Sequence, residues 1–242
     1  MTADSAALKH LLKVQDMDRS MDALRHQRTS LPEFDQVTEV EASGRVLAKK
    51  TEEVEAVRHE LERTQKRFED EVALLEDRVQ EENGKLYGGN VTGAKDLQAL
   101  QDEIKGLKDR QGLVEDSILE VMEAAEPVDA TLGGLAADKA GLEAELARLD
   151  AAIQQRQTEI EDELVAVGSQ RSDQAAGLDA SLVDEYDRIR SQPGRIGVAK
   201  LVGSTCHGCH LELPAMEIDR LRKLPDNELI HCEECGCILV RT

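Results

Sequence analysis

A repeating pattern of apolar residues runs through most of residues 8–164, and it constrains the fold more than any other feature of the sequence. Between residues 8 and 24, apolar side chains recur at steps of three or four, which predicts a helix that begins near residues 2–5. Pro32 should interrupt this helix, because proline lacks an amide donor and disfavours helical backbone in the residue before it. The pattern resumes between Leu47 and Val79 with charged residues between the apolar ones, as in a coiled coil.

Glycine and asparagine gather in residues 83–94, and these residue types favour turns. Beyond this segment, apolar residues recur in a seven-residue repeat over residues 97–121. The repeat falters at Pro127 and at the glycines that follow it, then returns and weakens after Gly168, so we expect a kinked second arm. The two arms are similar in length on either side of the turn. The sequence therefore predicts an antiparallel helical hairpin with its tip at about residues 83–94.

A parallel coiled coil formed between two chains is the alternative to this hairpin, and the glycine-rich turn disfavours it. The sequence leaves open whether the whole hairpin forms a homodimer. It also leaves open whether the breaks near Pro32 and Pro127 act as hinges.

The composition supports long helices rather than a thick globular core. The chain has no tryptophan, two phenylalanines and two tyrosines, while charged residues make up 33% of it. The formal net charge of −20 repels a nucleic-acid backbone unless basic residues gather locally. We find no apolar run long enough for a membrane span, and the N-terminal residues lack a secretory signal pattern. We therefore expect a soluble, cytoplasmic protein that does not engage the membrane.

Composition changes along the chain predict three regions. Residues 1–170 should form the coiled-coil hairpin, and residues 171–194 a connecting segment with a short helix through Leu182, Tyr186 and Ile189. In residues 195–242, short β-branched stretches alternate with glycine and proline, as small strands joined by turns would, with one or two helical turns between them. The expected fold class is mainly α, with a small C-terminal domain that contains β-strands.

All five cysteines lie in this last region, and four of them form two Cys-x-x-Cys pairs, Cys206 with Cys209 and Cys232 with Cys235. Paired knuckles of this kind supply the four thiolates of a tetrahedral zinc site. Because four thiolates leave no coordination position for water, we expect one structural Zn²⁺ per chain and no catalytic residues. The chain is thus predicted not to be an enzyme.

Other roles for the cysteines and for the neighbouring histidines are less well supported by the sequence. A redox dithiol motif should open a helix within a βαβ unit, and neither pair has that context. His207, His210 and His231 lie beside the cysteines, but the shell is complete without them. Cys237 either replaces Cys235 as a ligand or is a spare packed thiol, and we favour the spare role.

Two groups of residues are candidates for contacts with a partner. Arg220, Arg222 and Lys223 form a local basic cluster, although acidic residues slightly outnumber basic ones from Arg195 onward. At the predicted tip, the exposed aromatic Tyr87 lies between Lys85 and Lys95 and could serve as a contact point. Each group has an ordinary structural explanation too, as a solvated helical turn or as turn packing.

The tip sequence LYGGNVTGAKDLQALQDEI, followed far downstream by CHGC and CEECGCILV, resembles the bacterial four-cysteine zinc-ribbon proteins with an N-terminal coiled-coil hairpin. The resemblance covers nearly the whole chain. It implies one long hairpin plus a ribbon. For some members it implies a role in flagellar regulation, through an alternative sigma factor or messenger RNA.

Together these observations predict a non-enzymatic adaptor or regulator that contacts a macromolecular partner through its ribbon or its tip. A protein partner, including the transcription machinery, is favoured. A regulator that binds RNA or DNA is the alternative, and a redox or metal-dependent enzyme is the least favoured reading.

Overall fold

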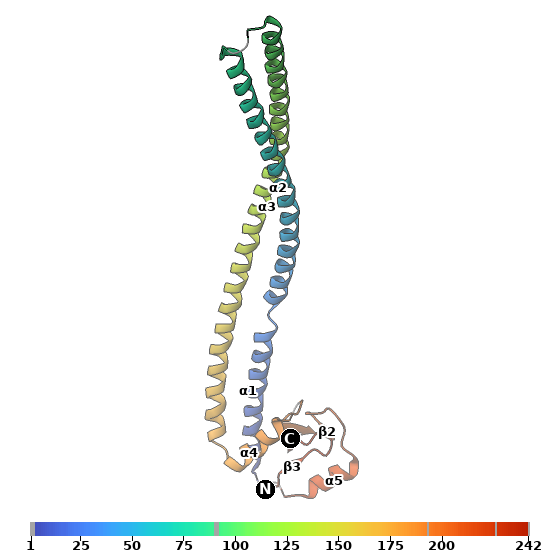
Figure 1. Ribbon diagram of the computed structural model, residues 1–242. Coiled ribbons are helices and arrows are strands. Elements are labelled where there is room, and N and C mark those ends of the chain that lie inside the picture. Colours follow the sequence, from blue (N-terminus) through green and yellow to red (C-terminus); the bar gives the residue numbers. More distant parts are fainter. Residues whose placement is uncertain (1–2, 90–91, 193, 226, 242) are drawn as a thin grey trace. The chain divides into compact units, whose positions relative to one another are not determined.

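The computed structural model describes residues 3–89, 92–192, 194–225 and 227–241. Three long helices come first, α1 (Ser5–Thr29), α2 (Pro32–Tyr87) and α3 (Ala94–Ala176), followed by the short helix α4 (Ala180–Arg190) (Figure 1). The remaining elements are β1 (Val198–Val202), β2 (Thr205–Cys206), α5 (Ala215–Lys223), β3 (Ile230–His231) and β4 (Ile238–Arg241). The predicted fold class, a long helical hairpin with a small β-containing C-terminal domain, is confirmed.

The chain divides into two compact units. One unit, here called the hairpin unit, consists of Asp35–Asp150. The other, the base unit, combines Met1–Phe34 with Ala151–Thr242 and so contains both ends of the chain. None of the helices in the described ranges is both long enough and apolar enough to cross a lipid bilayer.

In the hairpin unit, α2 and α3 run antiparallel (Figure 1), and they bury a narrow apolar seam. Ion pairs flank the seam, with Arg58 Nε 2.6 Å from Asp129 Oδ1 and Arg110 Nη2 2.8 Å from Glu71 Oε1. The buried seam residues are Leu75, Ile104, Val114, Ala125, Leu135 and Leu149. Because two helices cover only one face of each other, members of the predicted stripe at its margin stay exposed, and Val57 is one of them.

The hairpin unit differs from the expectation around Pro127. The helix α3 is continuous through Pro127, and buried Ala125 and Leu135 carry the seam across the positions where the repeat was expected to falter. Pro127 is exposed, so its ring lies away from the buried seam. The helix also continues beyond Gly168 to Ala176. The expected weakening at these residues was wrong, because packing along the seam outweighs the local cost of proline and glycine in a helix.

The tip is shorter than the predicted residues 83–94. The helix α2 continues through Tyr87, and the Asn83 amide donates to the carbonyl oxygen of Val79 at 2.7 Å, as a helical residue can. Gly89 adopts a positive φ of 75°, which explains glycine at this position. Residues 90–91 of the predicted tip lie outside the described residues.

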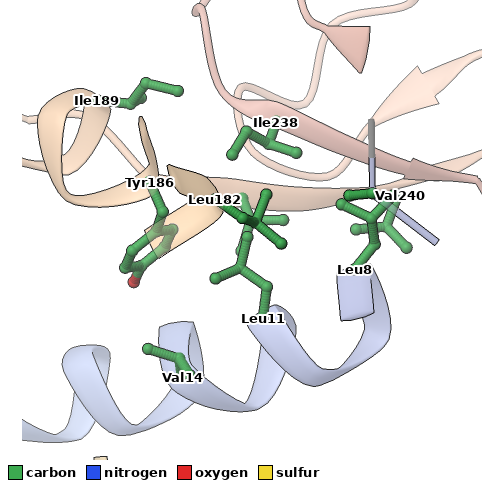
Figure 2. Close-up of a cluster of buried hydrophobic side chains, with 10 residues drawn as sticks. Leu8, Leu11, Val14, Leu182, Tyr186, Ile189, Ile238 and Val240 are labelled. Carbon is green, nitrogen blue, oxygen red and sulfur yellow. The ribbon is translucent and has the colours of Figure 1, made fainter. Parts of the chain in front are cut away.

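In the base unit, α1 begins at Ser5 because the Asp4 carboxylate caps it and accepts a hydrogen bond from the Ala7 amide at 2.6 Å. The Asp179 carboxylate caps α4 in the same way. The two helices and one face of the sheet bury a common core (Figure 2). That core includes Leu8, Leu11, Val14, Leu182, Tyr186, Ile189, Val198, Ile238 and Val240.

The four strands form one sheet in the order β2-β1-β4-β3. The central strands β1 and β4 are parallel, with Val198 opposite Ile238, and the outer pairs are antiparallel. Successive residues of a strand point to opposite faces. Val198 therefore packs on the helical core, whereas its neighbour Ala199 joins a second cluster with α5 and the cysteines. The sheet separates α1 and α4 from the cysteine site.

A buried polar network connects α1, α3 and α4 in the base unit. Asp18 on α1 is only 4% exposed, and its carboxylate accepts a hydrogen bond from the Tyr186 hydroxyl at 2.6 Å. The guanidinium groups of Arg171 and Arg190 lie 3.4 and 3.6 Å from the same carboxylate. These groups compensate the buried charge and hold α1, α3 and α4 together.

Two further contacts hold the start of β1 on the helices. The Gln15 side-chain oxygen accepts hydrogen bonds from the amides of Gly197 and Val198 at 2.9 and 3.3 Å. Gly197 lies so close to Tyr186 that an added Cβ would be 2.3 Å from the ring. Only glycine allows this approach.

Candidate metal centre

The first cysteine pair lies on a tight turn after β2. The Cys206 amide donates to the Leu211 carbonyl oxygen at 3.0 Å, and the Cys206 carbonyl oxygen accepts from the His210 amide at 2.7 Å. The Gly208 amide points at the Cys206 sulfur, with N and Sγ 3.4 Å apart. This turn directs both sulfurs to one side, as metal-binding knuckles do.

The second pair lies between β3 and β4. The Cys232 carbonyl oxygen accepts from the Gly236 amide at 2.8 Å, and the Cys232 amide donates to the Cys237 carbonyl oxygen at 2.9 Å. Gly236 adopts a positive φ of 74°, which a side chain would strain. Although β2 and β3 lie at opposite edges of one small sheet, the turns that follow them bring their cysteine sulfurs together.

The sulfur atoms of the four predicted ligands cluster together. The Sγ atoms of Cys206, Cys209, Cys232 and Cys235 all lie within 4.8 Å of one another. Cys206 Sγ lies 4.0 Å from Cys235 Sγ, and Cys209 Sγ lies 3.9 Å from Cys232 Sγ. Four sulfurs bound about 2.3 Å from one tetrahedral ion would be about 3.8 Å apart. The donor set and its spacing therefore fit Zn²⁺.

The thiols differ in their acidity. Burial raises the pKa of Cys206, but hydrogen bonds from the amides of Cys209 and Gly208 outweigh it, so the pKa lies below its ordinary value. Burial raises the pKa of Cys209 as well, and it raises the pKa of Cys232 to about 12. Since metal-bound cysteines are thiolates, loading of the site must release protons and weaken as the pH falls.

Cys237 lies beside the site but is packed differently. Its Sγ atom is 3.3 Å from Cys235 Sγ and 3.7 Å from Cys206 Sγ, and the residue is 1% exposed. Burial strongly raises the pKa of its thiol. Gly208 packs against it, since an added Cβ there would be 3.2 Å from Cys237 Sγ. Cys237 is not part of the group of four sulfurs that all lie within 4.8 Å of one another, which favours the spare packed thiol over a metal ligand.

The neighbouring histidines point elsewhere. His207 and His210 are exposed, with ring centroids 6.2 Å apart. His231 Nε2 lies 3.1 Å from Glu185 Oε1 on α4 and thereby links the ribbon to the helical core. Among the described residues, the group that could hold a metal ion consists of the four cysteines alone.

The predicted partner-binding residues fall into two separate sets. In the base unit, Arg220 pairs with Glu217 at 2.5 Å and lies 3.4 Å from Glu233, which neutralises part of the basic cluster. Arg222 and Lys223 are exposed at the end of α5.

In the hairpin unit, Tyr87 is 82% exposed at the end of α2. Lys85 lies 2.5 Å from Glu82, and Lys95 is exposed in the first turn of α3. Tyr87 is thus available for contacts, while the charge of Lys85 is already compensated.

Sequence reasoning missed a groove of about 650 Å³ in the base unit, where α1 meets the ribbon. Its lining contains Lys9, Lys13 and Arg19 from α1 together with Lys200 from β1. The spacing of Lys9 and Lys13, one helical turn apart, was the local signal. Nothing local relates these residues to Lys200, because only the packing of α1 on the sheet brings them together.

The fold and the cysteine cluster define a class of protein, a coiled-coil hairpin with a four-cysteine zinc ribbon. Residues 14–194 match the family model of the CT398-like coiled coil hairpin domain, and residues 205–239 match that of the C4-type zinc ribbon domain. The chain therefore belongs to the CT398-like coiled coil hairpin family. The resemblance inferred from the tip and cysteine motifs is confirmed.

Relatives match this chain over all or nearly all of their length. The uncharacterized protein Rv2229c of Mycobacterium tuberculosis is 30% identical over 241 residues, which cover 100% of this chain and 98% of that protein. A solved structure from Mycobacterium smegmatis has a TM-score of 0.87 at 24% identity and full coverage of both chains. The structure of CT398 from Chlamydia trachomatis has a TM-score of 0.67 at 21% identity and 98% coverage of both chains. The two structural matches support the same fold.

Proposed function

We propose that this protein is a non-enzymatic adaptor in which one structural Zn²⁺ per chain holds the ribbon and the hairpin presents binding surfaces to a protein partner. The convergence of four cysteine sulfurs within 4.8 Å of one another carries the proposal. A tetrathiolate site has no open coordination position for water or substrate, so its contribution is to the stability of the ribbon. The protein acts in the cytoplasm, and its partner belongs to a regulatory system such as the transcription machinery.

The way in which the base unit is built supports an adaptor. The ribbon rests on α1 and α4 through a shared apolar core and through the hydrogen bonds of Gln15 to β1. The metal site is thereby joined to the long helices in one compact unit. A rigidly mounted small domain is suited to presenting a surface, whereas catalysis requires a polar pocket around reactive groups.

The metal part of the proposal is tested on purified protein. We expect about one zinc per chain by elemental analysis. The Cys232→Ser/Cys235→Ser variant should lose the metal and unfold the ribbon while most of the helical circular dichroism remains. Zinc-dependent turnover of a substrate by the folded protein would contradict the non-enzymatic role.

The partner is tested by affinity capture from native lysate, with and without nuclease, using the intact chain and the same double variant. Proteins retained despite nuclease and lost with the variant support a ribbon-centred protein adaptor. Capture that consists of RNA and disappears on nuclease treatment would replace the adaptor with an RNA-binding regulator.

A further inference from the structure

The basic groove, defined here by Lys9, Lys13 and Arg19 on α1 and Lys200 on β1, concentrates positive charge in a strongly acidic chain. All four side chains belong to exposed residues. Within the described ranges, no carboxylate lies at ion-pair distance from any of them, in contrast to Arg171 and Arg190 in the same unit. Asp16 is the acidic residue of the lining. The groove therefore offers several uncompensated cations to a ligand.

The shape and floor of the groove restrict what can fill it. Its volume of about 650 Å³ exceeds that of a single small anion. From Lys9 to Arg19, α1 advances about 15 Å at about 1.5 Å per residue, so the cations form a row and do not converge on one point. Leu12, which is half-buried, contributes apolar surface beside them, whereas Val198 and Val240 of the lining are only 1% exposed. A ligand that matches has several negative charges along its length and apolar groups between them.

Acidic peptide segments have this chemistry, because carboxylates and apolar side chains alternate along them at intervals of a helical turn. Nucleic acid fits less well. Its backbone carries charge without apolar groups, and proteins that bind single strands use aromatic platforms for stacking. Among the described residues of the lining there is no tyrosine, phenylalanine or tryptophan, and the histidines His207 and His210 supply the only rings.

We propose that the basic groove between α1 and the ribbon is the docking site for an acidic, partly apolar segment of a partner protein. The proposal rests on the adaptor function and names the surface and the chemistry of its partner. The carboxylates of the segment pair with Lys9, Lys13, Arg19 and Lys200, and its apolar side chains cover Leu12 and the aliphatic stems of the lysines. Ion pairs at the rim mainly steer association and set specificity, and apolar burial supplies the remaining affinity.

The test uses the zinc-loaded full-length chain and a fluorescein-labelled synthetic helical peptide in which glutamate and leucine recur at helical spacing. A peptide with glutamine in place of glutamate, tripolyphosphate and a single-stranded RNA oligonucleotide are the comparison probes. Binding is measured by fluorescence anisotropy at two salt concentrations. We expect the glutamate peptide to bind, the glutamine peptide to bind much more weakly, and the affinity to fall as salt rises.

The variant K9E/K13E should weaken peptide binding about tenfold or more, because two rim cations become repulsive. The matched control is K105E/K108E, which makes the same charge change at two exposed lysines three residues apart on α3, in the hairpin unit and outside the groove. Its affinity should stay within about twofold of the intact chain. Zinc content and circular dichroism should be unchanged in both variants, since all four side chains are exposed.

Three results would overturn the groove assignment. They are equal binding of the glutamate and glutamine peptides, equal losses in K9E/K13E and K105E/K108E, and groove-dependent binding of RNA or tripolyphosphate that is tighter than that of the peptide. If the peptide fails to bind while zinc-dependent protein capture persists, the groove assignment fails and the adaptor stands. If no protein is captured at all, the adaptor function itself fails, whatever the peptide does.

Discussion

The Tyr186→Phe substitution should destabilise the base unit without disturbing its packing. The ring of Tyr186 is fully buried among α1, α4 and the sheet (Figure 2). Its hydroxyl donates a 2.6 Å hydrogen bond to the buried Asp18 carboxylate. Phenylalanine preserves the ring and removes only this donor. A hydrogen bond to a charged group contributes about 1.5–3 kcal/mol, so we expect a loss of this size. Arg171 and Arg190 still compensate the carboxylate, which keeps the variant folded.

Calorimetric unfolding of the zinc-loaded chain measures the effect, and Tyr87→Phe is the matched control. Tyr87→Phe removes the same hydroxyl at a residue that is 82% exposed. We expect it to change the free energy of unfolding by less than about 0.5 kcal/mol. For a chain of this size, a loss of 2 kcal/mol should lower the unfolding temperature of the affected transition by about 4–8 °C. Equal unfolding temperatures for the two variants would refute the reasoning that the Asp18 network stabilises the base.

The same pair of residues predicts a pH dependence. Burial, and then the hydrogen bond and charge of Asp18, raise the pKa of Tyr186 far above its ordinary value. A tyrosine in the unfolded chain ionises near about pH 10, so above that pH the unfolded state loses a proton that the native state keeps. This contribution to stability is complete below about pH 10 and is lost as the pH rises further. The Tyr186→Phe variant should lack this alkaline loss, and an identical alkaline profile in both proteins would contradict it.

Three further predictions concern the zinc ribbon and its packing against the helices. Gly197→Ala should cost more than about 2 kcal/mol in calorimetric unfolding, because the new Cβ would meet the Tyr186 ring at 2.3 Å, and a loss below about 0.5 kcal/mol would contradict the close approach. Cys232→Ser should abolish zinc binding by elemental analysis, whereas Cys237→Ala should retain it; loss of zinc from Cys237→Ala would make that residue a ligand. A chelator should remove the zinc and unfold the ribbon, yet leave most of the helical circular dichroism, since the hairpin has its own buried seam. Loss of the helical signal together with the ribbon would show that the hairpin and the ribbon do not unfold separately.

Local sequence patterns were sufficient for the fold class and for the metal centre. The apolar repeat predicts long helices because apolar residues at steps of three or four lie on one face of a helix. This spacing can be recognised within a short stretch of sequence. The cysteine pairs predict their site for a similar reason, since each knuckle is a short turn that is complete in itself. The short helix through Leu182, Tyr186 and Ile189 also followed from its own spacing, and all three residues are buried.

Local signals misled where tertiary packing opposes them. Pro127 and Gly168 are helix-breaking residues by propensity, yet the seam of α3 keeps them helical. Asn83 and Gly84 are turn formers that α2 nevertheless includes, which shortened the predicted tip. In each case the free energy of a long packed seam exceeds the preference of one or two residues.

What the sequence determined by itself was therefore the set of elements, a pair of long helical arms and a four-cysteine ribbon, because both are encoded at short range. Tertiary structure alone decided how these elements share a base. The pairing of Asp18 with Tyr186, the parallel register of β1 with β4, and the row of Lys9 and Lys13 beside Lys200 all join residues far apart in the chain. Such contacts leave no periodic trace in the sequence, since they arise only when elements far apart in the chain pack or pair with one another.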